Sequence, residues 1–487
     1  MNNFSLLSLT PVSPEIFLAL AGMVLLIVGA FMGSRSLRLI SWASVAAYVV
    51  TAVMILTMDA GRVETFGGLF VMDSFGGLTK IFLLFGLIAT AILSIQYLYQ
   101  EQMVRFEYPV LVLFSGVGMM LMVSAHDMLS LYVALELQSL SLYVLAAIRR
   151  DHLRSAESGM KYFILGAISS GFLLFGISLL YGYTGTTNFA LMGQALSAEV
   201  TLGAMIGMVF ILAGIAFKVS AVPFHMWTPD VYEGAPTSVT AFFAMVPKLA
   251  ALALIIRLVF EPFAALSHDW GQILWFLAAA SMVVGAFAGL RQANIKRLLA
   301  YSSIGNMGYA LMGIVATSAL GIGSLLFYMA IYMIMTAGTF AVILSMRRNG
   351  QSLENMSDLS GLSQNSPVLA YILALLMFSM SGIPTLAGFF GKFAVFQAAM
   401  DAHLYVLAVI GVLTSVVSAF YYLRVIKIMF FDAPVDRYDG EMSKGRQAVL
   451  ALSFGFILLF IFFPSGLLDI CRGVASSVVV AEAPVAP

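Results

Sequence analysis

The chain has 487 residues, of which 61% are hydrophobic and 10% are charged, and its 24 basic and 24 acidic side chains leave no formal net charge. Soluble domains are about one quarter charged, so this composition excludes a chain of soluble domains and predicts a polytopic membrane protein. The lack of a basic excess argues against nucleic-acid binding, and the single cysteine, Cys471, with five scattered histidines, disfavours a metal, haem or iron–sulfur site in this chain.

Apolar runs of roughly 18 or more residues are long enough to cross a bilayer. Such runs end here at charges, at Gly/Pro clusters or at groups of Asn, Ser and Asp. In chain order they cover residues 14–33, 37–57, 73–97, 107–125, 128–149, 157–183, 201–222, 236–260, 270–290, 297–316, 322–346, 366–400, 404–431 and 446–469. The predicted fold is therefore an all-α polytopic membrane protein with about fourteen transmembrane helices.

The Lys and Arg residues between these spans fall almost entirely on one side. With the loops assigned alternately to two faces, one face carries 17 of these residues, and the other carries Arg62, Arg257 and Arg472. By the positive-inside rule the rich face is cytoplasmic, and an even number of spans then places both termini on the periplasmic side. Met1 to Glu15 contains no Lys or Arg, so no cleaved signal peptide is expected.

Five charged side chains remain inside or near the apolar spans: Lys80, Glu136, Lys218, Lys248 and Lys392. A charge at mid-membrane costs about 2.5–3.5 kcal/mol, so such residues are expected either to lock helices together as ion pairs or to form a path for protons or ions. We favour the path for all of them except Lys80. That lysine lies near a helix end, from which its side chain could reach the membrane interface.

Burial disfavours the charged form of both lysine and glutamate, so each can release or take up a proton at small cost. A carboxylate placed beside Lys218 holds the lysine charged, and drawing Glu136 away from it releases the proton. Sodium prefers a cage of carboxylates and carbonyls, so a path rich in lysine favours protons. The sequence thus predicts a proton switch made of Glu136 and Lys218.

Two of these lysines lie on helices that proline and glycine interrupt. Lys218 precedes Pro223 in FKVSAVPFHMWTPDVYEGAPT, and Pro384 precedes Lys392 in SGIPTLAGFFGKFAVF. Proline removes a helix hydrogen bond and clashes with the preceding turn. Within a membrane such breaks are tolerated where the backbone lines a buried or wet cavity, so we expect the seventh and twelfth spans to be broken helices at a functional site.

An offset of five spans between the two breaks predicts two five-helix repeats of inverted topology. We therefore expect four parts in the chain: helices one to three (1–106), a first antiporter-like repeat of helices four to eight (107–260), a second repeat of helices nine to thirteen (261–431), and a cytoplasmic linker with a last helix and a short tail (432–487).

His225 follows the first break, and an imidazole titrates close to neutral pH. We favour a role in proton relay over that of a packed core residue. Asp230 and Glu233 lie towards the cytoplasmic end of the same segment. They could attract protons or serve only as loop acids, and the sequence does not decide between these two roles.

Four segments together resemble the antiporter-like membrane subunits of respiratory complex I: ALELQSLSLYVL, FKVSAVPFHMWTPDVYEGAPT, RQANIKRLLAYSSIGNMGY and SGIPTLAGFFGKF. The resemblance extends over nearly the whole chain. WTPDVYEGAPT is similar to the subunit N branch of the bacterial NADH–quinone oxidoreductases, the counterpart of mitochondrial subunit 2, rather than to the M and L branches. Lys392 stands where the M branch carries a glutamate, and Thr385 stands where a second proline is common.

The resemblance implies a proton-pumping subunit of a proton-translocating NADH:quinone oxidoreductase in the bacterial inner membrane. It implies that this chain holds no cofactor, because FMN, the iron–sulfur clusters and quinone bind to partner subunits. The expected partners are a neighbouring antiporter-like subunit, small membrane subunits and the lipid bilayer. The proton-transfer residues it implies are Glu136, Lys218, Lys248 and Lys392, with His225 as a further relay.

Two other functions stay open on the sequence. A multi-subunit cation/proton antiporter shares the fold and the Glu–Lys pattern, and the proteins that purify with the chain would distinguish it. A non-transporting scaffold would use the buried charges only to hold an assembly together. In that case, removing a charge would damage assembly before activity.

Overall fold

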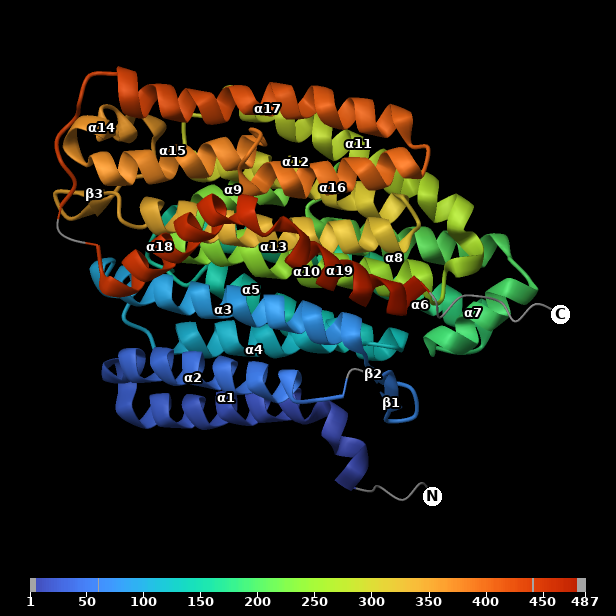
Figure 1. Ribbon diagram of the computed structural model, residues 1–487. Helices are drawn as coiled ribbons and strands as arrows, with labels where there is room; N and C mark the ends of the chain where they lie inside the picture. The colour runs from blue at the N-terminus through green and yellow to red at the C-terminus, as the bar shows by residue number, and fades with distance from the viewer. Residues whose placement is uncertain (1–5, 60, 440–441, 480–487) are drawn as a thin grey trace.

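Long helices run side by side in one bundle in the computed structural model, which describes residues 6–59, 61–439 and 442–479 (Figure 1). Among these residues, 11 segments are long and apolar enough to cross a membrane. One of them, Leu9–Leu56, contains two adjacent helices (Figure 1). The predicted all-α membrane fold is confirmed, whereas the count of fourteen spans and the inverted repeats stay predictions.

The α-helices are α1 (Ser13–Met32), α2 (Leu37–Leu56), α3 (Ser74–Gln100), α4 (Glu107–Val123), α5 (Met128–Ala146), α6 (Leu153–Thr184), α7 (Phe189–Ala198), α8 (Leu202–Val219), α9 (Trp227–Gly234), α10 (Thr237–Phe260), α11 (Ser267–Gly289), α12 (Ile295–Val315), α13 (Ala319–Ile343), α14 (Leu362–Asn365), α15 (Pro367–Ser381), α16 (Ala387–Asp401), α17 (Tyr405–Phe431), α18 (Lys444–Leu459) and α19 (Pro464–Val479). The 3-10 helices are η1 (Leu6–Val12), η2 (Gly33–Ser36), η3 (Ala264–Leu266), η4 (Met356–Leu359) and η5 (Phe460–Phe462). The strands form two antiparallel hairpins, β1 (Val63–Thr65) with β2 (Phe70–Met72) and β3 (Arg347–Arg348) with β4 (Gln351–Ser352).

Polar residues in the connections set where several helices begin. The first turn of a helix leaves backbone N–H groups without intrahelical partners, and a short polar side chain before it can accept a hydrogen bond from them. The residues that cap a helix in this way are Asp73, Asp127, Asn188, Thr201, Asn294, Ser318 and Ser443. The same residue types delimit the spans in the sequence.

The most buried helix is α10, in which every residue from Thr237 to Phe260 is shielded from the surface. Outer helices such as α1, α2 and α17 instead expose large apolar side chains, including Phe31 and Val416, as expected of surfaces that face lipid or a neighbouring subunit. A charged side chain on α10 therefore has only protein around it.

The bundle has two distinct ends. The β3–β4 hairpin, which contains Arg347, lies at one end, and the β1–β2 hairpin lies at the other, which we call the opposite end (Figure 1). The α5–α6 connection, with Arg149, and the start of α12, with Arg297, line one cavity with residues next to β3, and we call their end the basic end. The first helix begins and α19 finishes at this opposite end (Figure 1), which agrees with an even number of crossings. Which end faces the cytoplasm stays a prediction from the charge distribution.

The first predicted helix break is present. α8 ends at Val219 and α9 begins at Trp227, so the backbone between them is not helical. Ser220, the residue after the last turn of α8, has a left-handed backbone with φ of 67°. This conformation ends the helix. Lys218 lies in that last turn.

The second predicted break separates α15 from α16, between Ser381 and Ala387. Gly382 and Thr385 have left-handed backbones, with φ of 87° and 80°. A proline ring fixes φ near −65° and cannot adopt this conformation. Thr385, the departure from the family pattern, can reach this conformation where proline cannot, although a positive φ strains a β-branched residue.

The last predicted span differs from the structure. Residues 446–469 were expected to form one helix followed by a tail, but α18 ends at Leu459 and a second helix, α19, continues to Val479. Pro464 starts α19, because proline is tolerated in the first turn of a helix but not in its interior. α19 packs against α13 and α3.

Candidate proton-transfer site

Lys218 is held by neutral hydroxyl groups of α5. Its side chain is 6% exposed, and Nζ donates hydrogen bonds to Ser139 Oγ at 2.8 Å and Tyr143 Oη at 3.2 Å. The ammonium also lies 5.5 Å and 5.6 Å from the ring centroids of Tyr143 and Phe217, within the range of cation–π attraction. Lys218 is therefore buried among aromatic rings, with these two hydroxyls as its hydrogen-bond acceptors.

Glu136 and Lys218 do not form the direct ion pair that the sequence suggested. Glu136 is half-buried on α5 and accepts a short hydrogen bond from Ser170 of α6. Ser139 and Tyr143 follow it at three and seven residues, so the three side chains share one face of α5. Glu136 therefore lies on the same face of α5 as the two hydroxyl groups that contact Lys218.

Lys248 lies on α10 at the centre of the bundle and is 1% exposed. Its ammonium donates a short hydrogen bond to Ser303 Oγ of α12, which also accepts a hydrogen bond from Tyr332 Oη of α13 at 2.9 Å. The ring of Tyr232 lies 5.4 Å away. Like Lys218, this lysine has a hydroxyl as its nearest polar partner.

Lys392 lies at the second helix break. Its Nζ donates hydrogen bonds to the Ser381 carbonyl, at the end of α15, at 3.1 Å and to Ser415 Oγ of α17 at 2.9 Å. A cation is stabilised at a helix C-terminus, where carbonyl groups are unpaired. Gly382 leaves room for this arrangement, since a Cβ atom there would lie 3.1 Å from the lysine side chain.

Polar side chains of α12 connect the surroundings of Lys248 and Lys392. Asn306 accepts from Tyr328 Oη at 2.9 Å and donates to Ser302 Oγ at 3.3 Å, and the Tyr309 ring lies 5.0 Å from Lys392 Nζ. The sequence analysis did not single out these residues. Ser302, Asn306 and Tyr309 are three to four residues apart in an apolar helix, and this spacing indicates that they share one polar face.

His225 lies apart from the lysines. It is half-buried in the segment between α8 and α9, and no hydrogen bond or ring contact joins it to Lys218 or Lys248 in the part of the chain that the structure describes. Its predicted relay role therefore has no direct contact to support it.

Lys80 does not extend to the surface of the protein, as a side chain reaching for the membrane interface would. The side chain is fully buried, and Nζ lies 2.6 Å from Glu15 Oε1 of α1. Glu15 and Lys80 are 65 positions apart in the sequence, so they meet only because their two helices pack together. The sequence analysis did not recognise Glu15 as a buried carboxylate.

Asp230 and Glu233 belong to an ion-pair network near the basic end. Asp230 contacts Lys161 Nζ at 2.9 Å and Arg297 Nη1 at 2.8 Å, and Glu233 contacts Arg297 Nη1 at 2.9 Å. These groups are partly exposed. Exposed pairs of this kind contribute little stability, and the contacts agree with loop acids.

A cluster of charges at the opposite end was also missed. Arg257 is fully buried and contacts both carboxylate oxygens of Asp73, at 2.6 Å and 2.7 Å. Glu261 contacts Arg62 at 3.1 Å and His126 Nδ1 at 2.8 Å. The cluster ties α3, α10, the β1–β2 hairpin and the α4–α5 connection together.

Among the described residues, no group of three or more His, Cys, Asp or Glu side chains is placed to hold a metal ion. The ion pairs in which both side chains are buried involve other cations, among them Lys80 with Glu15, Arg257 with Asp73, and Arg347 with Glu101. Lys218, Lys248 and Lys392 have no carboxylate partner of this kind within the ranges the structure describes.

Comparison with known proteins connects this geometry to a family. The model described as NADH:quinone oxidoreductase/Mrp antiporter, transmembrane, matches residues 125–418. NADH-quinone oxidoreductase subunit N from Paramagnetospirillum magneticum is 51% identical, covering 96% of this chain and 98% of the relative. The protein of the same name from Rhodospirillum rubrum is 50% identical, covering 99% of each chain.

Two solved structures share the fold. A chain of respiratory complex I from Thermus thermophilus with bound aureothin has a TM-score of 0.80 and 31% identity, covering 94% of this chain and 98% of its own. A chain of the Mrp complex from a Dietzia species has a TM-score of 0.84 and 22% identity, covering 97% and 98%. At that identity the second likeness concerns the fold alone.

Proposed function

We propose a function for this chain on the premise of its family. The chain belongs to the NADH-quinone oxidoreductase subunit N family. That family lies within the wider NADH:quinone oxidoreductase/Mrp antiporter transmembrane family. It acts as a proton-translocating membrane subunit of a bacterial complex I, in the inner membrane beside the other membrane subunits. The oxidoreductase chemistry, with FMN, the iron–sulfur clusters and quinone, belongs to partner subunits. The basic end faces the cytoplasm by the positive-inside rule.

One observation carries this proposal: the three central lysines are buried beside hydroxyl groups rather than carboxylates. A buried lysine that only held helices together would need a carboxylate partner, as Lys80 has in Glu15. A lysine bonded to hydroxyls can lose its proton without leaving an unpaired carboxylate in the protein. Lys218, Lys248 and Lys392 are therefore suited to carry protons.

The position of Glu136, on the same helix face as the hydroxyl groups that hold Lys218, suggests how a signal reaches the path. Charge on the Glu136 carboxylate favours the protonated form of Lys218, because opposite charges attract even through intervening hydroxyls. Neutralising Glu136 removes that attraction, and Lys218 then releases its proton towards Lys248. Since Glu136 is half-buried at the bundle surface, a neighbouring subunit can change its charge state.

The Glu136→Gln variant should assemble but translocate protons several-fold more slowly, because glutamine keeps the shape and the bond to Ser170 while removing the charge. The measurement is NADH-driven proton uptake in vesicles beside a native gel of the complex. Glu157→Gln, an exposed glutamate on α6 that pairs with Lys161, is the matched control. Wild-type pumping by the assembled Glu136 variant would discard the switch.

Lys392→Ala should leave the complex assembled but lower the number of protons moved per electron pair, because it removes the ammonium at the end of α15 that passes protons onward. Lys427→Ala is the control, since Lys427 is a lysine of the neighbouring α17 with a side chain that is 62% exposed. A wild-type ratio of protons to electrons in an assembled Lys392 variant would remove this residue from the path.

Purification in mild detergent tests the assignment itself. A complex I subunit should purify with an NADH-oxidising peripheral arm. Purification with a set of small antiporter subunits instead would favour the cation/proton antiporter alternative.

A further inference from the structure

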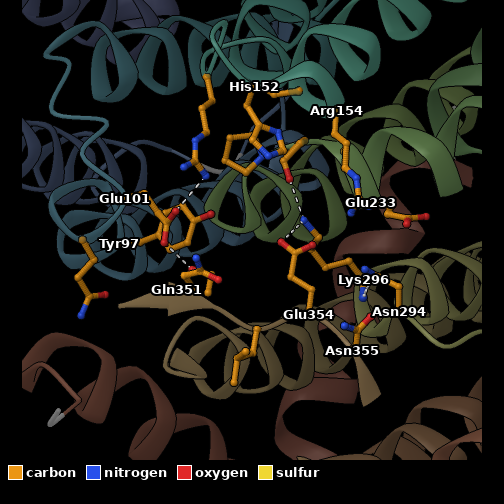
Figure 2. Close-up of a pocket in the computed structure, with 18 of the residues that line it drawn as sticks. Tyr97, Glu101, His152, Arg154, Glu233, Asn294, Lys296, Gln351, Glu354 and Asn355 are labelled. Atoms are coloured by element: carbon orange, nitrogen blue, oxygen red, sulfur yellow. Dashed lines mark hydrogen bonds and ion pairs between the residues drawn. The ribbon is translucent and has the colours of Figure 1, made fainter. Parts of the chain in front are cut away.

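A large polar cavity opens at the basic end, above the first residue of α10. Its volume is about 720 Å³, and its walls come from the end of α3, the α5–α6 connection, the α9–α10 turn, the start of α12 and segment 350–358. Figure 2 shows charged and polar side chains pointing into it from several of these elements, among them Glu101, His152, Lys296 and Glu354. This space lies outside the path through Glu136, Lys218, Lys248 and Lys392.

The floor of the cavity is closed by one ion pair. Lys296 Nζ lies 2.5 Å from Glu354 Oε1 and donates a hydrogen bond to the Ala235 carbonyl at 3.0 Å. Thr237 Oγ1, at the start of α10, donates to the same Glu354 oxygen at 3.1 Å. The lysine side chain is 2% exposed and the glutamate side chain is 25% exposed, so Glu354 is the member of the pair that water in the cavity reaches.

Inward from this pair, the buried serine hydroxyls of α12 begin at Ser302 and Ser303. Ser303, which bonds to Lys248, follows Lys296 by seven residues, so the two lie on one side of α12 about 10 Å apart. A second cavity of about 10 Å³ lies beside this stretch, lined in part by Ser302, Thr336 and Thr339. Such a space is about the size needed for one water molecule.

We propose that this cavity is the proton entrance to Lys248 and that the Lys296–Glu354 pair is its gate. The inference rests on the proposed function and deepens it. The central lysine then has a route of its own to the basic end, separate from the one through Lys218. The pair of Glu157 with Lys161, at the same end, differs from the gate because both of its side chains are more than 40% exposed.

Proton transfer through the gate begins at Glu354. Glu354 takes one proton from water in the cavity, which neutralises the carboxylate and breaks its attraction to the ammonium of Lys296. Lys296 gives its own proton inward, through water and the hydroxyls of Ser302 and Ser303, to deprotonated Lys248. The Glu354 proton then passes to Lys296 and restores the ion pair. One proton moves inward, and both gate residues return to their starting states.

The first test blocks the cavity after assembly, so that folding is not in question. Gln351 is exposed and lines the cavity, while the single native cysteine, Cys471, is buried. The complex with Gln351→Cys is labelled in inside-out vesicles with a bulky, membrane-impermeant maleimide. Proton translocation should fall about ten-fold or more on labelling, whereas the unlabelled variant should match the wild type.

Ser357→Cys is the control, because Ser357 is exposed on the same segment but does not line the cavity. Labelling this variant, or the wild-type complex, should leave the rate unchanged. A fully labelled Gln351→Cys complex that pumps at its unlabelled rate would overturn the entrance.

The second test alters the gate chemistry. Glu354→Gln should slow proton translocation about ten-fold, and Glu354→Asp, which keeps a carboxylate, should recover part of the loss. A purely structural glutamate would show no such recovery. Equal rates for Glu354→Gln and the wild type would overturn the gate. If Glu136→Gln stops pumping but the cavity variants do not, the entrance alone is wrong, and if all of them pump normally the proposed function is wrong.

Discussion

Lys248→Met should reduce NADH-driven proton translocation by about a hundred-fold or more, the scale at which a positioned proton-transfer group contributes. Methionine keeps the length of the side chain but cannot bind a proton. Every residue of α10 is buried, and no other titratable side chain of this helix lies beside the missing ammonium. The measurement is proton uptake by vesicles that contain the assembled complex, with the amount of complex fixed by a native gel.

Lys248→Arg separates charge from proton transfer. A guanidinium group keeps the positive charge but holds its proton too tightly to pass it on, so this variant should pump as poorly as Lys248→Met. If the arginine variant pumps like the wild type, only positive charge is needed at this position. If the methionine variant also pumps, Lys248 is not on the path.

The fold was largely predictable because lipid imposes simple constraints on the chain. A spanning helix needs a long apolar run, and the Pro and Gly residues near Lys218 and Lys392 correctly located both broken helices. The exceptions are local. Pro464 divides the last helical region, and the two hairpins lie in connections where hydropathy carries no signal.

The candidate site was predictable in its charges but not in its contacts. A lysine in an apolar run stands out in any sequence, whereas Ser139 or Ser303 does not, because serine is common in membrane helices. Which hydroxyl meets which lysine depends on how distant helices pack. The same reason hid the partners of Lys80 and Lys296, since Glu15 and Glu354 are far from them along the chain.

Asp73→Asn should destabilise the protein by about 3–5 kcal/mol, the cost of removing one partner from a buried ion pair. Arg257 is fully buried and has both of its contacts with Asp73 oxygens at or below 2.7 Å. Asparagine can still accept the hydrogen bond from Gly76 N that caps α3, so the variant removes charge while keeping the cap. The measurement is the thermal midpoint of the complex in detergent at pH 7.

Asp127→Asn is the matched control. Asp127 also caps a helix at the opposite end, but it accepts hydrogen bonds only from Leu129 N, Ser130 N and Thr187 Oγ1, and no cation pairs with it among the described residues. Its loss of charge should change the midpoint far less. Equal midpoints for the two variants would mean that the Asp73–Arg257 pair adds nothing beyond a helix cap.

The same cluster should make the protein sensitive to acid. Burial opposes ionisation of Asp73, but the charge and hydrogen bonds of Arg257 outweigh it and lower the pKa of the carboxyl group. Burial likewise opposes ionisation of Glu261, whose pKa is lowered by His126 and Arg257. A carboxylate with a lowered pKa stabilises the fold at pH values above its unfolded-state pKa, which is about 3.9 for Asp and 4.3 for Glu. This stabilisation is lost as the pH falls through the folded-state pKa.

The wild-type midpoint should therefore fall steeply as the pH drops below about 4, and that of Asp73→Asn should fall less, because one of the titrating groups is already gone. Parallel decreases in the two proteins would show that other carboxylates control the acid sensitivity.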